Sequence, residues 1–197
     1  MPTAYKHLRG QRAVRQWCSE VLARAEFPLA SAVVDTSVGQ VHLTSAGTGP
    51  TRVVLVPGTG FNAAVTLPWL RVLSARWATT VVDLPGQPGL SDARRPRRDG
   101  LAWSGRVLDE VLAGLDVEAI VLVGNSLGAA VALAAGSPRI AARALVSAIP
   151  PHRDGCLASR RDLSGWLATC GLQPDDQNCD HPRMANELDP PGRRALT

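Results

Sequence analysis

The chain has 197 residues, of which 45% are hydrophobic, and its formal net charge is +4. It contains no run of about 18 apolar residues and no apolar N-terminal stretch, which excludes a transmembrane helix and a secretory signal. We therefore expect a cytoplasmic globular protein without a membrane partner, long enough to bury a core of its own.

The first part of the chain predicts a helix followed by a β-hairpin. Residues 6–26 repeat apolar side chains at the spacing of an amphipathic helix, with Arg and Glu between them. Residues 32–35 and 41–44 flank a short turn that contains Ser and Gly, which is typical of a hairpin. His42 alternates with apolar residues there, so we expect a histidine on the surface of a strand.

From residue 52 onward, predicted strands and helices alternate. Runs rich in β-branched residues predict strands at 52–56, 79–83 and 119–123, and residues 142–149 close the pattern as one more strand. Helical patterns occupy the segments between them, at about 68–77, 102–115 and 126–135. Two antiparallel strands followed by such units indicate an α/β fold, with a mostly parallel sheet and helices on both faces.

The pattern changes near residue 150. Residues 151–197 contain no Val, Ile, Phe or Tyr, the residue types from which strands are built. They predict one short helix at 163–170 and otherwise a polar, Pro-rich, poorly ordered tail. We therefore divide the chain into an N-terminal amphipathic helix at 1–30, an α/β core at 31–150 that lacks the last strands, and this tail.

The basic residues and the cysteines suggest no further ligand. Lys6 is the only Lys, and the Arg-rich run at 94–98 has no aromatic residues among it, so we expect a solvated loop and no nucleic-acid partner. The cysteines at 18, 156, 170 and 179 form no Cys-x-x-Cys pair. They predict free thiols, with no metal site and no cofactor.

The segment Gly124-Asn125-Ser126-Leu127-Gly128 carries the chemistry. It lies between a Val-Leu-Val strand and an Ala-rich helix, where a sharp turn would raise the Ser126 hydroxyl above the carboxyl edge of the sheet. Gly124 and Gly128 remove side chains that would collide in such a turn, and the Leu127 N–H becomes an oxyanion donor. The alternative is a glycine-rich turn with an incidental Ser.

With this segment the chain resembles the α/β-hydrolase superfamily, in its esterase, lipase and thioesterase-like group, over about residues 33–149. The segment Val56-Pro57-Gly58-Thr59-Gly60 is similar to the family's His-Gly-x-x oxyanion loop, with Pro57 in place of His. By this resemblance, Thr59 supplies the second oxyanion N–H. Residues 83–91 are similar to the family's Asp-x-x-Gly-x-Gly-x-Ser segment with one residue inserted, which shapes the sheet and does no chemistry.

The family places an acid and then a His after the nucleophile, and that His must lie within about 3 Å of the Ser as general base. Because the predicted sheet stops after the equivalent of the sixth strand, the usual positions of both partners are missing. Weak candidates remain, and we identify neither acid nor base among them: His152, Asp154, Asp175, Asp180 and His181.

The resemblance implies that Ser126 hydrolyses an ester or thioester of a small-molecule acyl substrate through an acyl-enzyme. The alternative is a catalytically incomplete hydrolase fold that acts as a binding module or has no function. The composition after residue 150 favours a frameshift or truncation there, and a natural short member of the family stays open. In either case the last strand would leave an exposed sheet edge, which predicts self-association.

Overall fold

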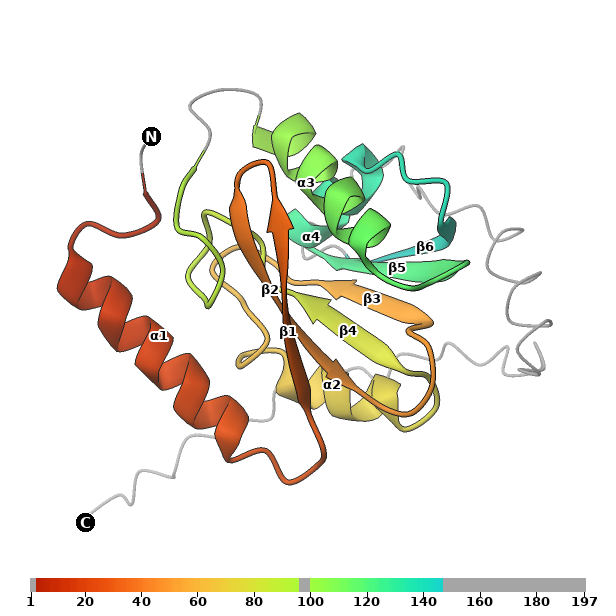
Figure 1. The fold of residues 1–197 in the computed structure, drawn as a ribbon, viewed down its shortest axis with the longest axis horizontal. Coiled ribbons are helices and arrows are strands. Elements are labelled where there is room, and N and C mark those ends of the chain that lie inside the picture. The colour runs from red at the N-terminus through yellow and green to blue at the C-terminus, as the bar shows by residue number, and fades with distance from the viewer. Residues whose placement is uncertain (1–2, 96–99, 147–197) are drawn as a thin grey trace, which may run out of the picture.

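A single mixed sheet forms the centre of the computed structural model, which describes residues 3–95 and 100–146 (Figure 1). Its six strands lie in the order β1-β2-β4-β3-β5-β6. The strands are β1 (Ala30–Thr36), β2 (Gly39–Ala46), β3 (Val53–Val56), β4 (Thr79–Val82), β5 (Ile120–Asn125) and β6 (Ile140–Val146). The helices are α1 (Leu8–Ala23), α2 (Leu67–Ser74), α3 (Gly100–Gly114) and α4 (Leu127–Ala134).

The strand directions follow from the order of the elements along the chain. β1 and β2 form the predicted hairpin, and β2 also pairs antiparallel with β4. β4, β3, β5 and β6 run parallel to one another. Every residue of β3 and β4 is buried, as expected for parallel strands covered on both faces. The predicted α/β fold with a mostly parallel sheet is therefore confirmed, and in the described part of the chain the sheet ends at β6.

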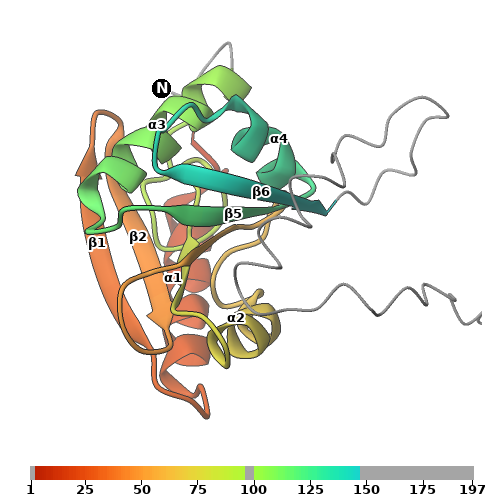
Figure 2. The same cartoon turned by 90° about the vertical axis from the view of Figure 1, so that its right-hand side faces the viewer.

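Helices cover the two faces of the sheet unequally (Figures 1 and 2). α3 and α4 pack on one face around a larger core that includes Val54 and Leu108. On the other face α2 packs on a smaller core that includes Leu55 and Leu70. Val54 and Leu55 are consecutive in β3, so their side chains point to opposite faces and each contributes to a different core.

Few contacts hold α1 against the part of the molecule that contains β2. Cys18 is its one buried residue, and Leu22 packs at the margin of the smaller core. Arg15 donates from Nη1 to the carbonyl oxygen of Ser91 at 3.2 Å. The helix predicted over residues 6–26 is thus present with shorter bounds.

His42 is not the surface residue that the strand pattern predicted. Its side chain is half-buried, and its Nδ1 is buried with no hydrogen-bond partner among the described residues. Burial lowers the pKa of His42, while the charge of Asp83 opposes this shift. The alternation along β2 separates its two faces correctly, but it cannot show that α1, which carries Arg15, covers the face on which His42 lies.

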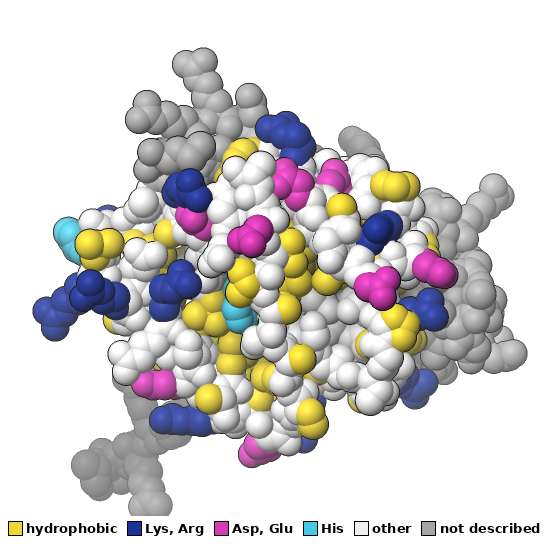
Figure 3. All heavy atoms as spheres, viewed as in Figure 1, with side chains coloured by type: hydrophobic (Ala, Val, Ile, Leu, Met, Phe, Trp, Pro, Cys, Tyr) yellow, Lys and Arg dark blue, Asp and Glu magenta, His cyan; other side chains and the backbone are white. Residues whose placement is uncertain are grey.

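Two further predictions concern the charged side chains of the surface and a membrane-spanning helix. Arg94 forms an ion pair with Asp92 at 2.9 Å, and Figure 3 shows basic and acidic side chains intermixed on the face in view. None of the helices in residues 3–95 and 100–146 is long and apolar enough to span a membrane. The rest of the Arg-rich run, residues 147–149 of the last predicted strand and the tail from 151 lie outside the described residues.

Candidate active site

The backbone turns sharply at Ser126, between β5 and α4. With φ of 52° and ψ of −113°, Ser126 is the one non-glycine residue with positive φ in the described part of the chain. Side chains of L-residues are crowded in this region of the φ/ψ map, so the conformation costs about 1–3 kcal/mol. Such strain concentrates at functional sites, where the surrounding structure enforces it.

Gly124 and Gly128 lie where any side chain would meet backbone. A Cβ on Gly124 would lie 2.5 Å from the carbonyl oxygen of Gly128 and 2.6 Å from the Cα of Ala129. A Cβ on Gly128 would collide with the carbonyl oxygens of Val56 and Pro57 at the end of β3. Because these obstacles are backbone atoms of packed elements, both positions require glycine, and α4 can approach β3 directly.

The described surroundings of Ser126 fix its backbone and form no hydrogen bond with its hydroxyl. Its N–H donates to the carbonyl oxygen of Val146 at 2.8 Å, which ties the turn to the end of β6. Its side chain is half-buried, and within residues 3–95 and 100–146 no group forms a hydrogen bond with the hydroxyl. His42 lies three strands away in the sheet order, about 14 Å at the usual strand spacing, so it is not the base.

The loop after β3 passes directly beside Ser126. A Cβ on Gly58 would lie 3.3 Å from the Cβ of Ser126, so a side chain there would be tightly packed. Phe61 donates its N–H to the carbonyl oxygen of Gly58 at 3.0 Å, which closes a turn around Thr59. Leu127 is the first residue of α4, where a helix leaves its N–H groups without intrahelical partners. The two predicted oxyanion donors, Thr59 and Leu127, therefore lie in segments that adjoin Ser126.

Side chains that the sequence analysis did not single out hold this loop. The Oε1 atom of Gln87 accepts the N–H of Gly60 at 3.0 Å, and Asn62 donates from Nδ2 to the carbonyl oxygen of Pro88 at 3.0 Å. Both bonds join the loop after β3 to the loop after β4. Pro57, which replaces the family's usual His, is buried at the start of the loop, and these bonds brace the loop in the absence of that His.

Asp83 joins the same two loops through hydrogen bonds to its carboxylate. Its buried carboxylate accepts the N–H of Ala63 at 2.7 Å and the N–H of Leu90 at 3.0 Å. Burial raises the pKa of Asp83, and the two backbone N–H groups and His42 oppose this shift. A carboxylate at the end of a buried strand was the available signal for this bracing role, because such a group must find donors nearby.

The other candidate triad residues fall outside the described part of the chain, and the structure says nothing of their positions. They are His152, Asp154, Asp175, Asp180 and His181. Within residues 3–95 and 100–146, no three His, Cys, Asp or Glu side chains lie together so that they could hold a metal ion. The described site thus consists of a strained serine, the N-terminus of α4 and a braced loop.

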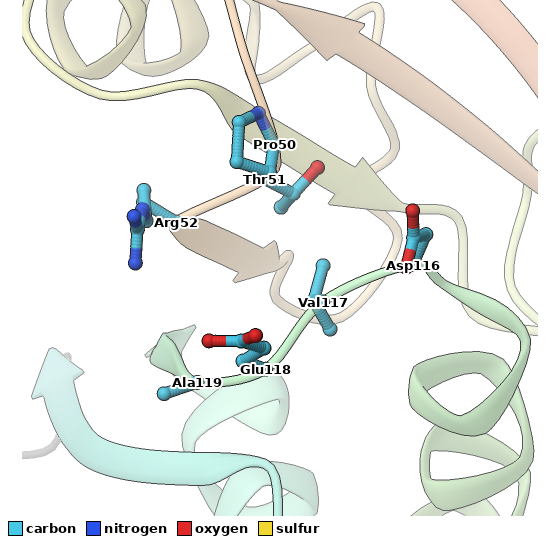
Figure 4. Close-up of a pocket in the computed structure, with 7 residues that line it drawn as sticks. All are labelled: Pro50, Thr51, Arg52, Asp116, Val117, Glu118 and Ala119. Atoms are coloured by element: carbon cyan, nitrogen blue, oxygen red, sulfur yellow. The ribbon is translucent and has the colours of Figure 1, made fainter.

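A hollow of about 340 Å³ lies at the opposite end of the strands (Figure 4). It is lined by Pro50, Thr51, Arg52, Asp116, Val117, Glu118 and Ala119. These residues precede β3 and β5, whereas Ser126 follows β5. Ligands of open α/β sheets bind beyond the carboxyl ends of the strands, so we assign the hollow no role in this site.

The fold agrees with a comparison to known families. The model of the alpha/beta hydrolase family matches residues 53–195. This range covers most of the chain, and the protein belongs to the alpha/beta hydrolase family. The match also extends beyond residue 150, and the origin of the segment 151–197 stays a prediction. A search of curated proteins found no match.

Solved structures show the same fold. A protein from Bacillus subtilis classed as a hydrolase superposes with a TM-score of 0.59 at 22% identity, over 80% of this chain and 60% of its own. Naproxen esterase from Bacillus subtilis gives 0.57 at 24% identity, over 85% and 62%. Carboxylesterase CesB from Bacillus subtilis gives 0.56 at 21% identity, over 69% and 49%. This chain therefore spans less than two thirds of the length of these structures.

Proposed function

We propose that the protein is a serine-dependent hydrolase of carboxylic esters or thioesters that acts on a small-molecule acyl substrate. The observation that carries this proposal is the strained backbone of Ser126 between β5 and α4, with a glycine loop against its side chain. A simple connecting turn has no reason to hold a non-glycine residue at φ of 52°, whereas a nucleophile elbow requires it. Esterases among the structural relatives give the reaction class its support.

The mechanism follows from what each group can do. The Oγ atom of Ser126 attacks the carbonyl carbon of the substrate while its proton passes to a general base. The carbonyl oxygen becomes an oxyanion, which the N–H groups of Thr59 and Leu127 and the positive end of α4 stabilise. Collapse of this intermediate expels an alcohol or thiol, which takes up the proton. Water then attacks the acyl-enzyme by the same steps and releases the acid. No metal or organic cofactor takes part in this scheme.

The general base is the part of this scheme that the described residues do not supply. The candidates are His152 and His181, with Asp154, Asp175 or Asp180 as the acid. Because the free hydroxyl of a serine is a weak nucleophile at neutral pH, one such histidine must reach Ser126 for hydrolysis to proceed.

The alternative function is binding of an acyl compound without hydrolysis. A hydrolase fold without a triad would bind an acyl compound at the same loop and helix N-terminus and leave it intact. This alternative predicts that Ser126→Ala changes no hydrolytic rate, since there is none above background.

Hydrolysis of p-nitrophenyl esters and of an acyl thioester by the full chain tests the proposal. We expect turnover that Ser126→Ala abolishes and that Ser137→Ala leaves unchanged. Ser137 is a suitable control because it is also half-buried but precedes β6, at the opposite end of the strands. If the folded protein hydrolyses neither substrate, or if Ser126→Ala retains full activity, the proposal is wrong.

A further inference from the structure

The residues that precede α1 pack on the loop after β4, residues 83–95 (Figure 1). Thr3 forms an isolated antiparallel bridge with Arg94. Ala4 donates its N–H to the carbonyl oxygen of Ala93 at 2.8 Å. Backbone contacts therefore fix the segment before α1 to this loop, although the two are far apart in the sequence.

Tyr5 binds the middle of the same loop through its hydroxyl. The hydroxyl accepts the N–H of Gly89 at 3.0 Å and donates to the carbonyl oxygen of Gly89 at 3.5 Å. Gly89 is buried, and a buried N–H without a hydrogen bond is costly. Loss of the Tyr5 hydroxyl would therefore leave this N–H without a partner unless Gly89 shifted towards water.

Gly89 lies against two of the residues that brace the loop after β3. A Cβ on Gly89 would lie 2.8 Å from the Oδ2 atom of Asp83 and 3.2 Å from the Cβ of Asn62. Closely packed interiors transmit displacements from one group to the next. A shift of Gly89 would thus also change the positions of Asp83 and Asn62.

The residues on both sides of Gly89 carry hydrogen bonds that hold the loop after β3. Two positions before it, the Oε1 atom of Gln87 accepts the N–H of Gly60. One position after it, Leu90 donates its N–H to the carboxylate that also accepts the N–H of Ala63. Gly60 and Ala63 belong to the loop that passes beside the reactive serine. The Tyr5 hydroxyl therefore holds the segment on which this bracing depends.

α1 provides a second anchor for the same segment. Arg15 donates from Nη1 to the carbonyl oxygen of Ser91 at 3.2 Å, and the Ser91 hydroxyl donates to the carbonyl oxygen of Asp83 at 2.6 Å. The charge of Arg15 also acts on the Asp83 carboxylate, so replacing Arg15 would change two interactions at once. Tyr5 allows a cleaner test, because its hydroxyl can be removed alone.

We propose that Tyr5 is a positioning residue of the active site. Its hydroxyl holds Gly89 and, through Gly89, the loop that presents Thr59 as an oxyanion donor beside Ser126. This inference rests on the proposed function of Ser126. An oxyanion donor contributes most in the transition state, so its misplacement lowers kcat and has little effect on substrate binding.

Kinetics of Tyr5→Phe, which keeps the ring and removes the hydroxyl, test this role in the full chain. Thr51→Val is the matched control, because it removes a half-buried hydroxyl that bonds to the Thr80 hydroxyl at 2.9 Å, at the opposite end of the strands. We expect Tyr5→Phe to lower kcat for a p-nitrophenyl ester about fivefold with little change in KM, and Thr51→Val to change neither. In a Gln87→Ala background, Tyr5→Phe should lower kcat by less than about twofold, because the loop is already released.

Hydrogen exchange followed by NMR tests the coupling without any hydrolysis. We expect Tyr5→Phe to speed exchange of the Gly60 and Ala63 amides at least about threefold, and Thr51→Val to leave their exchange unchanged. Equal exchange of the α3 amides in all three proteins verifies that the fold is kept.

Unchanged exchange at Gly60 and Ala63 would overturn the proposal. An unchanged kcat in a protein that hydrolyses the ester would overturn it as well, and so would a full fivefold effect of Tyr5→Phe in the Gln87→Ala background. If the unmodified chain hydrolyses no ester or thioester, the proposed function is wrong, and the exchange result alone decides whether Tyr5 holds the loop.

Discussion

Replacing Ser126 by Gly separates the strain of the turn from its chemistry. At φ of 52° and ψ of −113°, the backbone of Ser126 carries a strain energy of about 1–3 kcal/mol, which a glycine would not have. Glycine loses about 0.5–1 kcal/mol more conformational entropy on folding than a residue with a Cβ. The difference predicts that Ser126→Gly raises the free energy of unfolding by about 1 kcal/mol, which for a chain of this size raises Tm by about 2–4 °C.

Ser126→Ala is the matched control for this measurement. It removes the same hydroxyl but keeps the Cβ, and with it the strain, so we expect a free energy of unfolding close to that of the unchanged protein. Urea unfolding followed by circular dichroism compares the three proteins. If the Gly variant is no more stable than the Ala variant, the turn is not strained in solution and the elbow geometry is wrong.

Three further predictions follow from other contacts. Gly128→Ala places a Cβ against two backbone carbonyls, and we expect urea unfolding to show a free energy of unfolding lower by about 3 kcal/mol. A decrease of less than about 1 kcal/mol would contradict the packing of α4 on β3. Gln87→Ala frees Gly60 and should lower kcat of ester hydrolysis about tenfold with little change in Tm, and an unchanged kcat would show that the bond does not position the loop. Burial and then the charge of Asp83 raise the pKa of Cys18 from 9.0 to about 11, so its protonated form is favoured on folding. The contribution of Cys18 to the free energy of unfolding is therefore fully present below pH 9. Up to about 2 kcal/mol of it is lost as the pH rises towards 11. Cys18→Ala should remove this slope, and a slope that persists would assign it to another group.

The fold could be predicted because its strands and helices repeat at different periods. β3 is a continuous apolar run and β4 is a run of β-branched Thr and Val, and a parallel sheet buries such runs on both faces. The turn at Ser126 could be located for a related reason: only glycine fits at positions 124 and 128, so the geometry leaves a fixed spacing in the sequence.

The bracing of the site could not be read in the same way. Gln87, Asn62 and Asp83 each act on a loop from another part of the chain, and their partners are mostly backbone atoms, which leave no residue pattern. His42 was assigned to the surface because strand periodicity separates two faces without showing what covers them. α1 approaches that face from a segment far upstream, through Arg15 and Cys18.

Reaction with a fluorophosphonate probe tests the role of Ser126 most directly, because the probe needs no knowledge of the natural substrate. The folded full chain should acquire a single adduct by mass spectrometry, and peptide mapping should place it on Ser126. Ser126→Ala and the urea-unfolded protein should acquire none. A folded protein that stays unlabelled, or that carries the adduct on a different serine, would contradict the assignment of Ser126 as the nucleophile.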